Sequence, residues 1–167
     1  LGTGANCVVL TVGAVKFNPW NSVEPHSGFL ERLDVDQQDH MGRKIDELTL
    51  QWWAKQDEHI RQEALGDEGR IAIVDFCKKL NKWLVGCDKI WCQGPQFDMV
   101  ILENLYRQMK QPLPWNFWQV RDSRTLFSMM PQDPRKAIRT DAHNALADCY
   151  YQAKCIQQSF SHFNISK

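Results

Sequence analysis

The sequence has no excess charge of either sign and no long apolar segment. Twenty basic side chains balance twenty acidic ones among the 167 residues. This balance argues against a protein that coats nucleic acid by charge alone, but not against an enzyme that grips one end of a strand, since metal-binding carboxylates would add negative charge to such a site. No apolar run approaches the roughly 20 residues that a membrane-spanning helix needs. The sequence therefore predicts no membrane partner.

Cysteine pairs of the C-x-x-C type are also absent. The six cysteines do not cluster with histidine at the spacing of zinc ligands. Several occupy apolar positions of helical or strand patterns, which indicates buried free thiols in a reducing compartment, with disulfides as the less favoured alternative. We therefore expect a cytoplasmic protein.

Apolar residues, in contrast, are plentiful. They make up 43% of the chain, with seven Trp and eight Phe, which is typical of a globular protein. The length suits a single domain over residues 1–167, and no repeat, low-complexity tract or linker divides it. Apolar periodicity and turn residues predict strands at about 8–15, 29–35, 89–93 and 117–120 and helices at about 46–65, 70–85, 97–109, 123–130 and 141–160.

This order of elements indicates an α/β domain with a mixed sheet. The first two strands are close enough in sequence to form an antiparallel hairpin, and the later ones are joined through helical crossovers. The first strand is almost wholly apolar, so we expect it to be covered on both faces.

The last predicted helix opens with HNALADCYYQA, in which His143 and Asp148 are five residues apart. Five helical steps separate two side chains by roughly 140°, so they converge only if Asp148 lies in the first turns and His143 at or before the helix start. Asp141 is the expected N-cap. An accessible histidine there would titrate near neutral pH, as a general base requires. The alternative is a surface histidine in a capping region and a solvated aspartate.

A second candidate, Asp98, lies in WCQGPQFDMVILENLY. A buried strand ends there at a Gly-Pro turn, and Asp98 falls in the first turn of the next helix. Functional groups of open α/β sheets gather beyond the carboxyl ends of strands, and a carboxylate suits a hard cation. The alternative is an aspartate that stabilises a helix N-terminus through the helix dipole.

Together the two segments resemble the DEDDh family of 3′–5′ exonucleases, which has a ribonuclease H-like fold. More of the chain is similar to the RNase T-like branch, which includes phage and bacterial enzymes of the exodeoxyribonuclease VIII type. GTGANCVVLTVGAVKFNP resembles the second strand of that branch, TLQWWAKQDEHIRQEAL its double-Trp helix, and RDSRTL the segment before the final motifs. The resemblance extends over essentially the whole chain, in the right order.

The resemblance implies a metal-dependent 3′–5′ exonuclease. Asp98 and Asp148 would bind two Mg²⁺ or Mn²⁺ ions, and His143 would be the general base that activates water. Two such ions can stabilise the attacking and leaving oxygens of an in-line displacement. The implied substrate is a single-stranded 3′ end of DNA or RNA, cleaved to nucleoside monophosphates. Family members often form homodimers, and they work in a bacterial cytoplasm or, if phage-encoded, in that of the host.

The sequence departs from the family in its first motif, D-x-E-T, which supplies two acidic ligands on the central strand. No D-x-E precedes Val8. In relatives the motif runs directly into a turn such as L-G-T-G, so we expect it within the four residues before Leu1. We accordingly expect a ribonuclease H-like mixed sheet flanked by helices, with its central first strand outside this sequence and the exonuclease domain incomplete at its N-terminus.

Five further residues are candidates for substrate contacts. Leu1 and Gly2 follow the first motif, where the family meets the terminal nucleotide. Phe97 would stack on a base, or else belong to the core. Of the two adjacent tryptophans we expect one in the core and the other, Trp53, exposed at the lip of a cleft. Arg139 would hold a backbone phosphate, or else be a solvated loop charge.

Two other functions stay open at this stage. One is an inactive member of the same fold that binds nucleic-acid ends or a replication partner; the missing first motif favours it and the intact H-N-A-L-A-D opposes it. The other is a structural α/β domain in which the motifs are coincidental.

Overall fold

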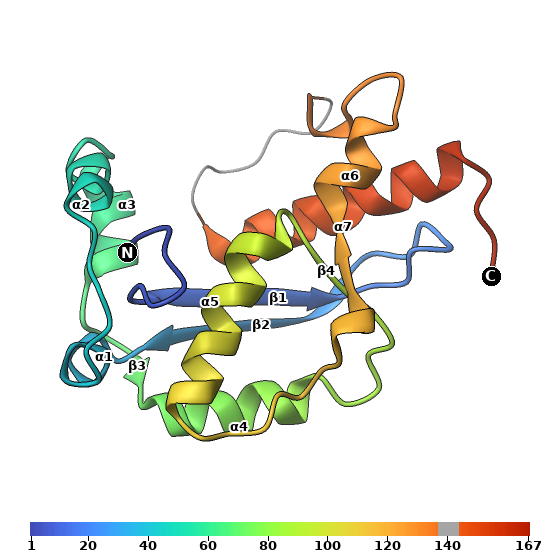
Figure 1. Cartoon of the computed structure of the whole chain (residues 1–167). Helices are drawn as coiled ribbons and strands as arrows, with labels where there is room; N and C mark the ends of the chain where they lie inside the picture. The colour runs from blue at the N-terminus through green and yellow to red at the C-terminus, as the bar shows by residue number, and fades with distance from the viewer. Residues whose placement is uncertain (137–143) are drawn as a thin grey trace.

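The computed structural model describes residues 1–136 and 144–167, and in these residues helices pack around short strands (Figure 1). The strands are β1 Thr11–Lys16, β2 His26–Leu33, β3 Arg70–Ile71, β4 Ile90–Cys92 and β5 Val120–Asp122. The α-helices are α1 Val35–His40, α2 Glu47–Ala54, α3 Glu58–Leu65, α4 Ile73–Trp83, α5 Pro95–Gln108, α6 Ser123–Ser128 and α7 Ala145–His162. Two 3-10 turns, η1 Phe117–Gln119 and η2 Pro134–Lys136, complete the set.

The strands form one mixed sheet and one parallel pair. β1 and β2 are an antiparallel hairpin, and β3 joins β2 in parallel, with Leu33 opposite Ile71. β4 and β5 pair in parallel, with Cys92 opposite Asp122. The predicted α/β class with a mixed sheet is therefore confirmed, whereas the ribonuclease H-like arrangement stays a prediction.

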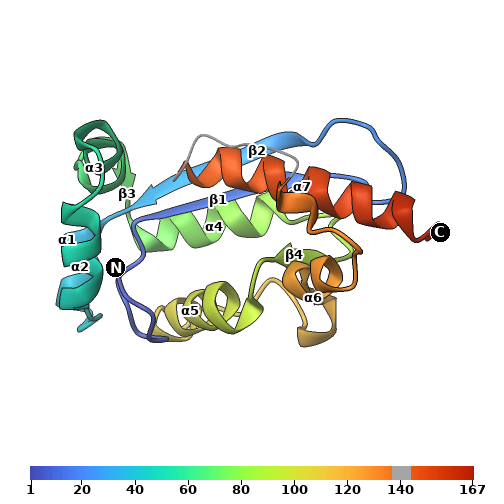
Figure 2. The same cartoon turned by 90° about the horizontal axis from the view of Figure 1, so that it is seen from above.

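Two helices cover opposite faces of the hairpin (Figures 1 and 2). Neighbouring strand residues point to opposite sides, so Phe29 faces the core with α4 while Gly28 faces α7. The main core gathers apolar side chains of β2, α4 and α5: Phe29, Leu33, Ile73, Phe76, Leu80, Leu105 and Tyr106. A second cluster joins α6 to α7: Leu126, Phe127, Cys155, Ile156 and Phe160.

Several boundaries differ from the predicted ones. The helix expected over 46–65 is two helices, because α2 ends at Ala54 and α3 starts anew after Asp57. The helix expected from residue 70 begins at Ile73, because the backbone of Arg70 and Ile71 pairs with β2. The strand expected at 117–120 is the turn η1 followed by β5.

β1 is covered on both faces, as predicted: Gly13 lies against α7, and Val12 and Ala14 pack against the main core. Its residues are nevertheless only half-buried, and the described strands pair with one of its edges only. Helix α1 was not predicted; its N-cap Asp34 accepts from the backbone N–H of Gln37 at 2.8 Å, a local bond that needs no long apolar stripe.

All six cysteines are free, as predicted, and Cys7, Cys77 and Cys155 are buried. Burial raises the pKa of Cys77 to about 11. Within the described part of the chain, no helix is both long and apolar enough to cross a bilayer.

Candidate active site

The β4–α5 turn places Asp98. β4 ends at Cys92, and Gly94 then takes a left-handed conformation with φ of 104° as the N-cap of α5, a conformation that favours glycine. Pro95 occupies the start of the helix, where its missing N–H costs nothing. Asp98 therefore lies in the first turn of α5, as predicted.

The start of α7 places Asp148. Asn144 is the N-cap, and its Oδ1 accepts from the backbone N–H groups of Leu146 at 3.1 Å and Ala147 at 2.9 Å. Asp148 consequently lies in the first turn of α7, as the spacing argument required. The expected N-cap Asp141 was wrong, because the amide of Asn144 caps the helix instead. His143 and Arg139 lie outside the described residues.

Two glycines let α7 approach the hairpin. A Cβ at Gly13 of β1 would lie 2.6 Å from the carbonyl oxygen of Ala145, so the backbone of the first residue of α7 rests directly on the strand. A Cβ at Gly28 of β2 would lie 3.2 Å from Leu146 Cδ1 and 3.3 Å from the Tyr150 hydroxyl. The position of Asp148 in the fold thus depends on the absence of side chains at two strand positions.

Asp98 and Asp148 come together around Cys149. Burial and, to a smaller extent, the negative charges of Asp148 and Asp98 together raise the pKa of the Cys149 thiol to about 12. Burial and the charges of Asp98 and Asp122 do the same to Cys92. Asp98 accordingly lies near the end of β4 and near the start of α7, so two of the predicted carboxylates lie near the same thiol.

The Asp98 carboxylate is held in an unfavourable environment. Burial raises its pKa, which the positive charge of Arg124 only partly offsets. Arg124 follows β5 and its guanidinium carbon lies 3.6 Å from the Cβ that Gly94 lacks. A partly buried carboxylate that lies near the same thiol as a second one offers oxygen donors of the kind that a divalent cation prefers. Sequence reasoning missed Arg124, because it lies in RDSRTL, a segment used only for its resemblance.

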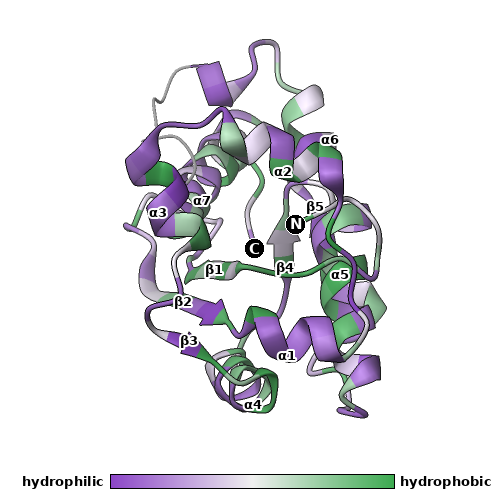
Figure 3. Ribbon diagram, turned by 90° about the vertical axis from the view of Figure 1, so that its left-hand side faces the viewer, coloured by the Kyte–Doolittle hydropathy of each residue, from purple (hydrophilic) through white to green (hydrophobic). Residues whose placement is uncertain are grey.

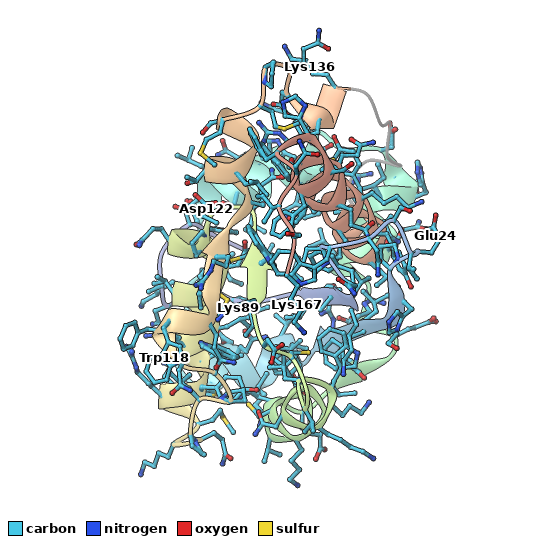
Figure 4. The ribbon with its side chains drawn as sticks, turned by 90° about the vertical axis from the view of Figure 1, so that its right-hand side faces the viewer. Glu24, Lys89, Trp118, Asp122, Lys136 and Lys167 are labelled. Carbon is cyan, nitrogen blue, oxygen red and sulfur yellow. The ribbon has the colours of Figure 1, made fainter. Side chains whose placement is uncertain are left out.

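Asp122 connects the two turns at this edge. As N-cap of α6 it accepts from Arg124 N at 3.0 Å and from the Thr125 hydroxyl at 2.7 Å. Burial acts to raise its pKa, but these bonds and one from the backbone of Gly94 outweigh it, and the pKa is lowered. Figure 4 shows Asp122 between Trp118 and Lys136 along this side of the molecule.

We expect D122A to lower the free energy of unfolding by about 1 kcal/mol, the usual value of an N-cap. Because the folded pKa lies below the ordinary 3.8, the contribution of the charge is present above pH 3.8 and is lost as the pH falls through the folded value. D122N keeps a capping oxygen, so it should retain most of the stability but lose this pH dependence. Urea unfolding at pH 7 and pH 3 measures both; a D122A protein as stable as wild type would contradict the assignment.

The remaining predicted residues of the described chain lie at the N-terminus, in α2 and in α5. Leu1 is half-buried and Gly2 buried against the start of α2, where the Leu1 carbonyl accepts from Asp46 N at 2.9 Å. A small cavity of about 220 Å³ adjoins Gly2. Phe97 is 46% exposed, beside Asp98 in sequence.

The tryptophan expectation needs correction. Trp52 is the exposed ring, at 44%, while Trp53 is half-buried, and neither belongs to a core cluster. The two rings meet edge to face at 5.0 Å between centroids. They are successive residues of one short helix, so they point about 100° apart, and the packing of α2 decides which one is covered.

A larger cavity, of about 730 Å³, lies between α3 and the start of α7. Its lining includes His59, Glu63, Asn144 and Tyr150. No residue on α3 was predicted to belong to a site, and the sequence gives no signal for it. In the described residues, no cluster contains three or more His, Cys, Asp or Glu side chains arranged for a metal ion.

The fold and the site define an α/β protein with carboxylates gathered where two parallel strands end and a long helix begins. Residues 1–160 match the family of 3′–5′ exoribonuclease Rv2179c-like domains, and the chain belongs to that family. It is also similar to the exodeoxyribonuclease of Enterobacteria phage T4, with 23% identity over 182 positions that cover 89% of this chain and 80% of the relative. No solved structure matches the chain. The chain is thus a member of a nuclease family.

Proposed function

We propose that the protein is a metal-dependent 3′–5′ exonuclease of the DEDDh type, in the RNase T-like branch. Its substrate is the 3′ end of single-stranded nucleic acid, and its products are nucleoside monophosphates. The observation that carries the proposal is that Asp98 and Asp148, from segments about 50 residues apart in sequence, both lie near Cys149. Membership of an exoribonuclease-like family and similarity to an exodeoxyribonuclease support the same activity.

In this proposal each residue has one task. Asp98 and Asp148 hold Mg²⁺ or Mn²⁺ through their carboxylate oxygens, and His143 takes the proton from the attacking water. Two such ions, when bound, stabilise the attacking and leaving oxygens of the phosphodiester. The exposed ring of Phe97 stacks on a base near the cleaved bond.

Other residues add further contacts to the substrate. Leu1 and Gly2 meet the terminal nucleotide, Arg139 holds a phosphate, and the tryptophan pair of α2 borders the cleft, with Trp52 as its exposed member. The acidic residues of the first motif stay a prediction, as does a homodimer.

One labelling assay tests the direction of cleavage, the need for a metal ion and the preference for DNA or RNA. Matched single-stranded DNA and RNA oligonucleotides, labelled at the 3′ or the 5′ end, are incubated with the full-length natural protein and Mn²⁺, Mg²⁺ or EDTA. We expect 3′-labelled substrate to release a labelled mononucleotide at once and 5′-labelled substrate to shorten stepwise, with no reaction in EDTA. Binding of 3′ ends without hydrolysis would indicate the inactive binding module instead.

A further inference from the structure

One side chain on α3 contacts the cap of the helix that carries Asp148. Glu63 Oε1 accepts a hydrogen bond of 2.7 Å from Asn144 Nδ2. The oxygen of the same amide caps α7 through Leu146 N and Ala147 N. Asn144 thus uses both ends of its amide, one toward α7 and the other toward α3.

Glu63 lies on α3, and Arg70 connects the C-terminal end of this helix to the strands. The carbonyl oxygen of Ala64, next to it in sequence, accepts from Arg70 Nη2 at 3.0 Å, and that of Gly66 from Arg70 Nε at 3.0 Å. The Arg70 guanidinium also binds the carbonyls of Leu10 and Leu33 through Nη1. The end of α3 is therefore fixed to the strands, and Figure 3 shows α3 beside α7.

The contact selects one orientation of the cap amide. Only the amide oxygen can accept from the helix N–H groups, and only the amide nitrogen can donate to a carboxylate. Glu63 therefore favours the capping orientation over the flipped one. The N-cap residue is also hydrogen-bonded to the site itself, because the Asn144 carbonyl accepts from Asp148 N at 2.9 Å.

We propose that Glu63 is a positioning residue for Asp148: by holding the Asn144 amide it fixes the first turn of α7 and hence the place of the Asp148 carboxylate. The inference rests on the proposed function, in which that carboxylate holds a metal ion.

Replacing the amide donor of Asn144 with a carboxylate acceptor tests its contact with Glu63. N144D keeps a capping oxygen but places a second carboxylate against Glu63. We expect kcat to fall about tenfold with KM changed less, and E63Q in the same chain to restore kcat to within about threefold, since the glutamine amide donates to the new carboxylate. Hydrogen exchange of the Leu146 and Ala147 amides should quicken in N144D and slow again in the double variant.

Gln62 provides the matched control. Its Nε2 donates to Glu58 Oε1 at 3.2 Å on the exposed side of the same helix, so Q62A should change neither kcat nor the exchange of these amides. Exchange in N144D equal to that in wild type, or a double variant no better than N144D, would overturn the proposal. So would losses of kcat that simply follow losses of Tm. A wild-type protein that cleaves no nucleic acid refutes the proposed function, while the exchange measurements still decide whether Glu63 holds the start of α7.

Discussion

Replacing Asp98 or Asp148 with asparagine is expected to abolish nucleotide release while leaving the protein folded. Metal ions in such sites contribute several kcal/mol of charge stabilisation to the transition state, so a loss on the order of 10³-fold in kcat follows when one carboxylate becomes an amide. The measurement is the rate of mononucleotide release from a 3′-labelled oligonucleotide in saturating Mn²⁺.

Unlike nucleotide release, the stability of the folded protein should not fall when Asp98 is replaced. Burial raises its pKa, so the native state loses stability as the pH rises above the ordinary value of 3.8 and the carboxylate ionises. D98N removes that charge, and its Tm in EDTA at pH 7 should equal or exceed that of wild type. Mn²⁺ should raise the Tm of wild type more than that of D98N.

A matched control is D75N on α4. Asp75 is also in the first turn of a helix, but it is exposed and paired with Lys78 at 3.5 Å. Its substitution should change nucleotide release by less than about twofold, because an exposed ion pair of this kind contributes little. Full activity in D98N or D148N would show that the metal site lies elsewhere.

The second large effect is expected at Gly13, where a methyl group meets the backbone of α7. G13A places a carbon 2.6 Å from the Ala145 carbonyl oxygen, a contact that only a shift of the helix relieves. Overpacking of this kind costs about 1–3 kcal/mol of unfolding free energy. Because the shift moves the first turn of α7, nucleotide release should fall as well. Urea unfolding and the release assay measure the two effects.

Alanine substitutions at two other glycines should destabilise the protein less than G13A. A methyl group at Gly28 meets the ends of the Leu146 and Tyr150 side chains, which can move, so G28A should be milder than G13A. At Gly4 no atom lies within 4 Å of the added carbon, and G4A should leave the stability near that of wild type. Equal losses at Gly13 and Gly4 would contradict the close approach of α7 to β1.

The sequence predicted elements where a local pattern was strong. The stripe of Ile73, Phe76, Cys77 and Leu80 gave the body of α4, and Gly94-Pro95 gave the start of α5 with Asp98 in its first turn. It failed where distant contacts decide the structure. β3 has only two residues, whose strand conformation depends on pairing with β2.

The candidate site, like the fold, could be predicted from the sequence only in part. Residue type and spacing made Asp98, Asp148 and His143 candidates, because metal binding and proton transfer restrict the residues that can perform them, and the resemblance to the exonuclease family selected them over the structural alternatives. The sequence could not show that Trp52 and not Trp53 is exposed, or that Glu63 meets Asn144 across 81 residues.

The sequence by itself therefore determined the α/β class and the free thiols, which follow from residue type and local periodicity, and it pointed to the candidate carboxylates through the family resemblance. Only the tertiary structure decided that Asp98 and Asp148 share one neighbourhood and that α7 lies against Gly13. Such relations depend on how closely two backbones approach, which is set by packing between segments far apart in the chain.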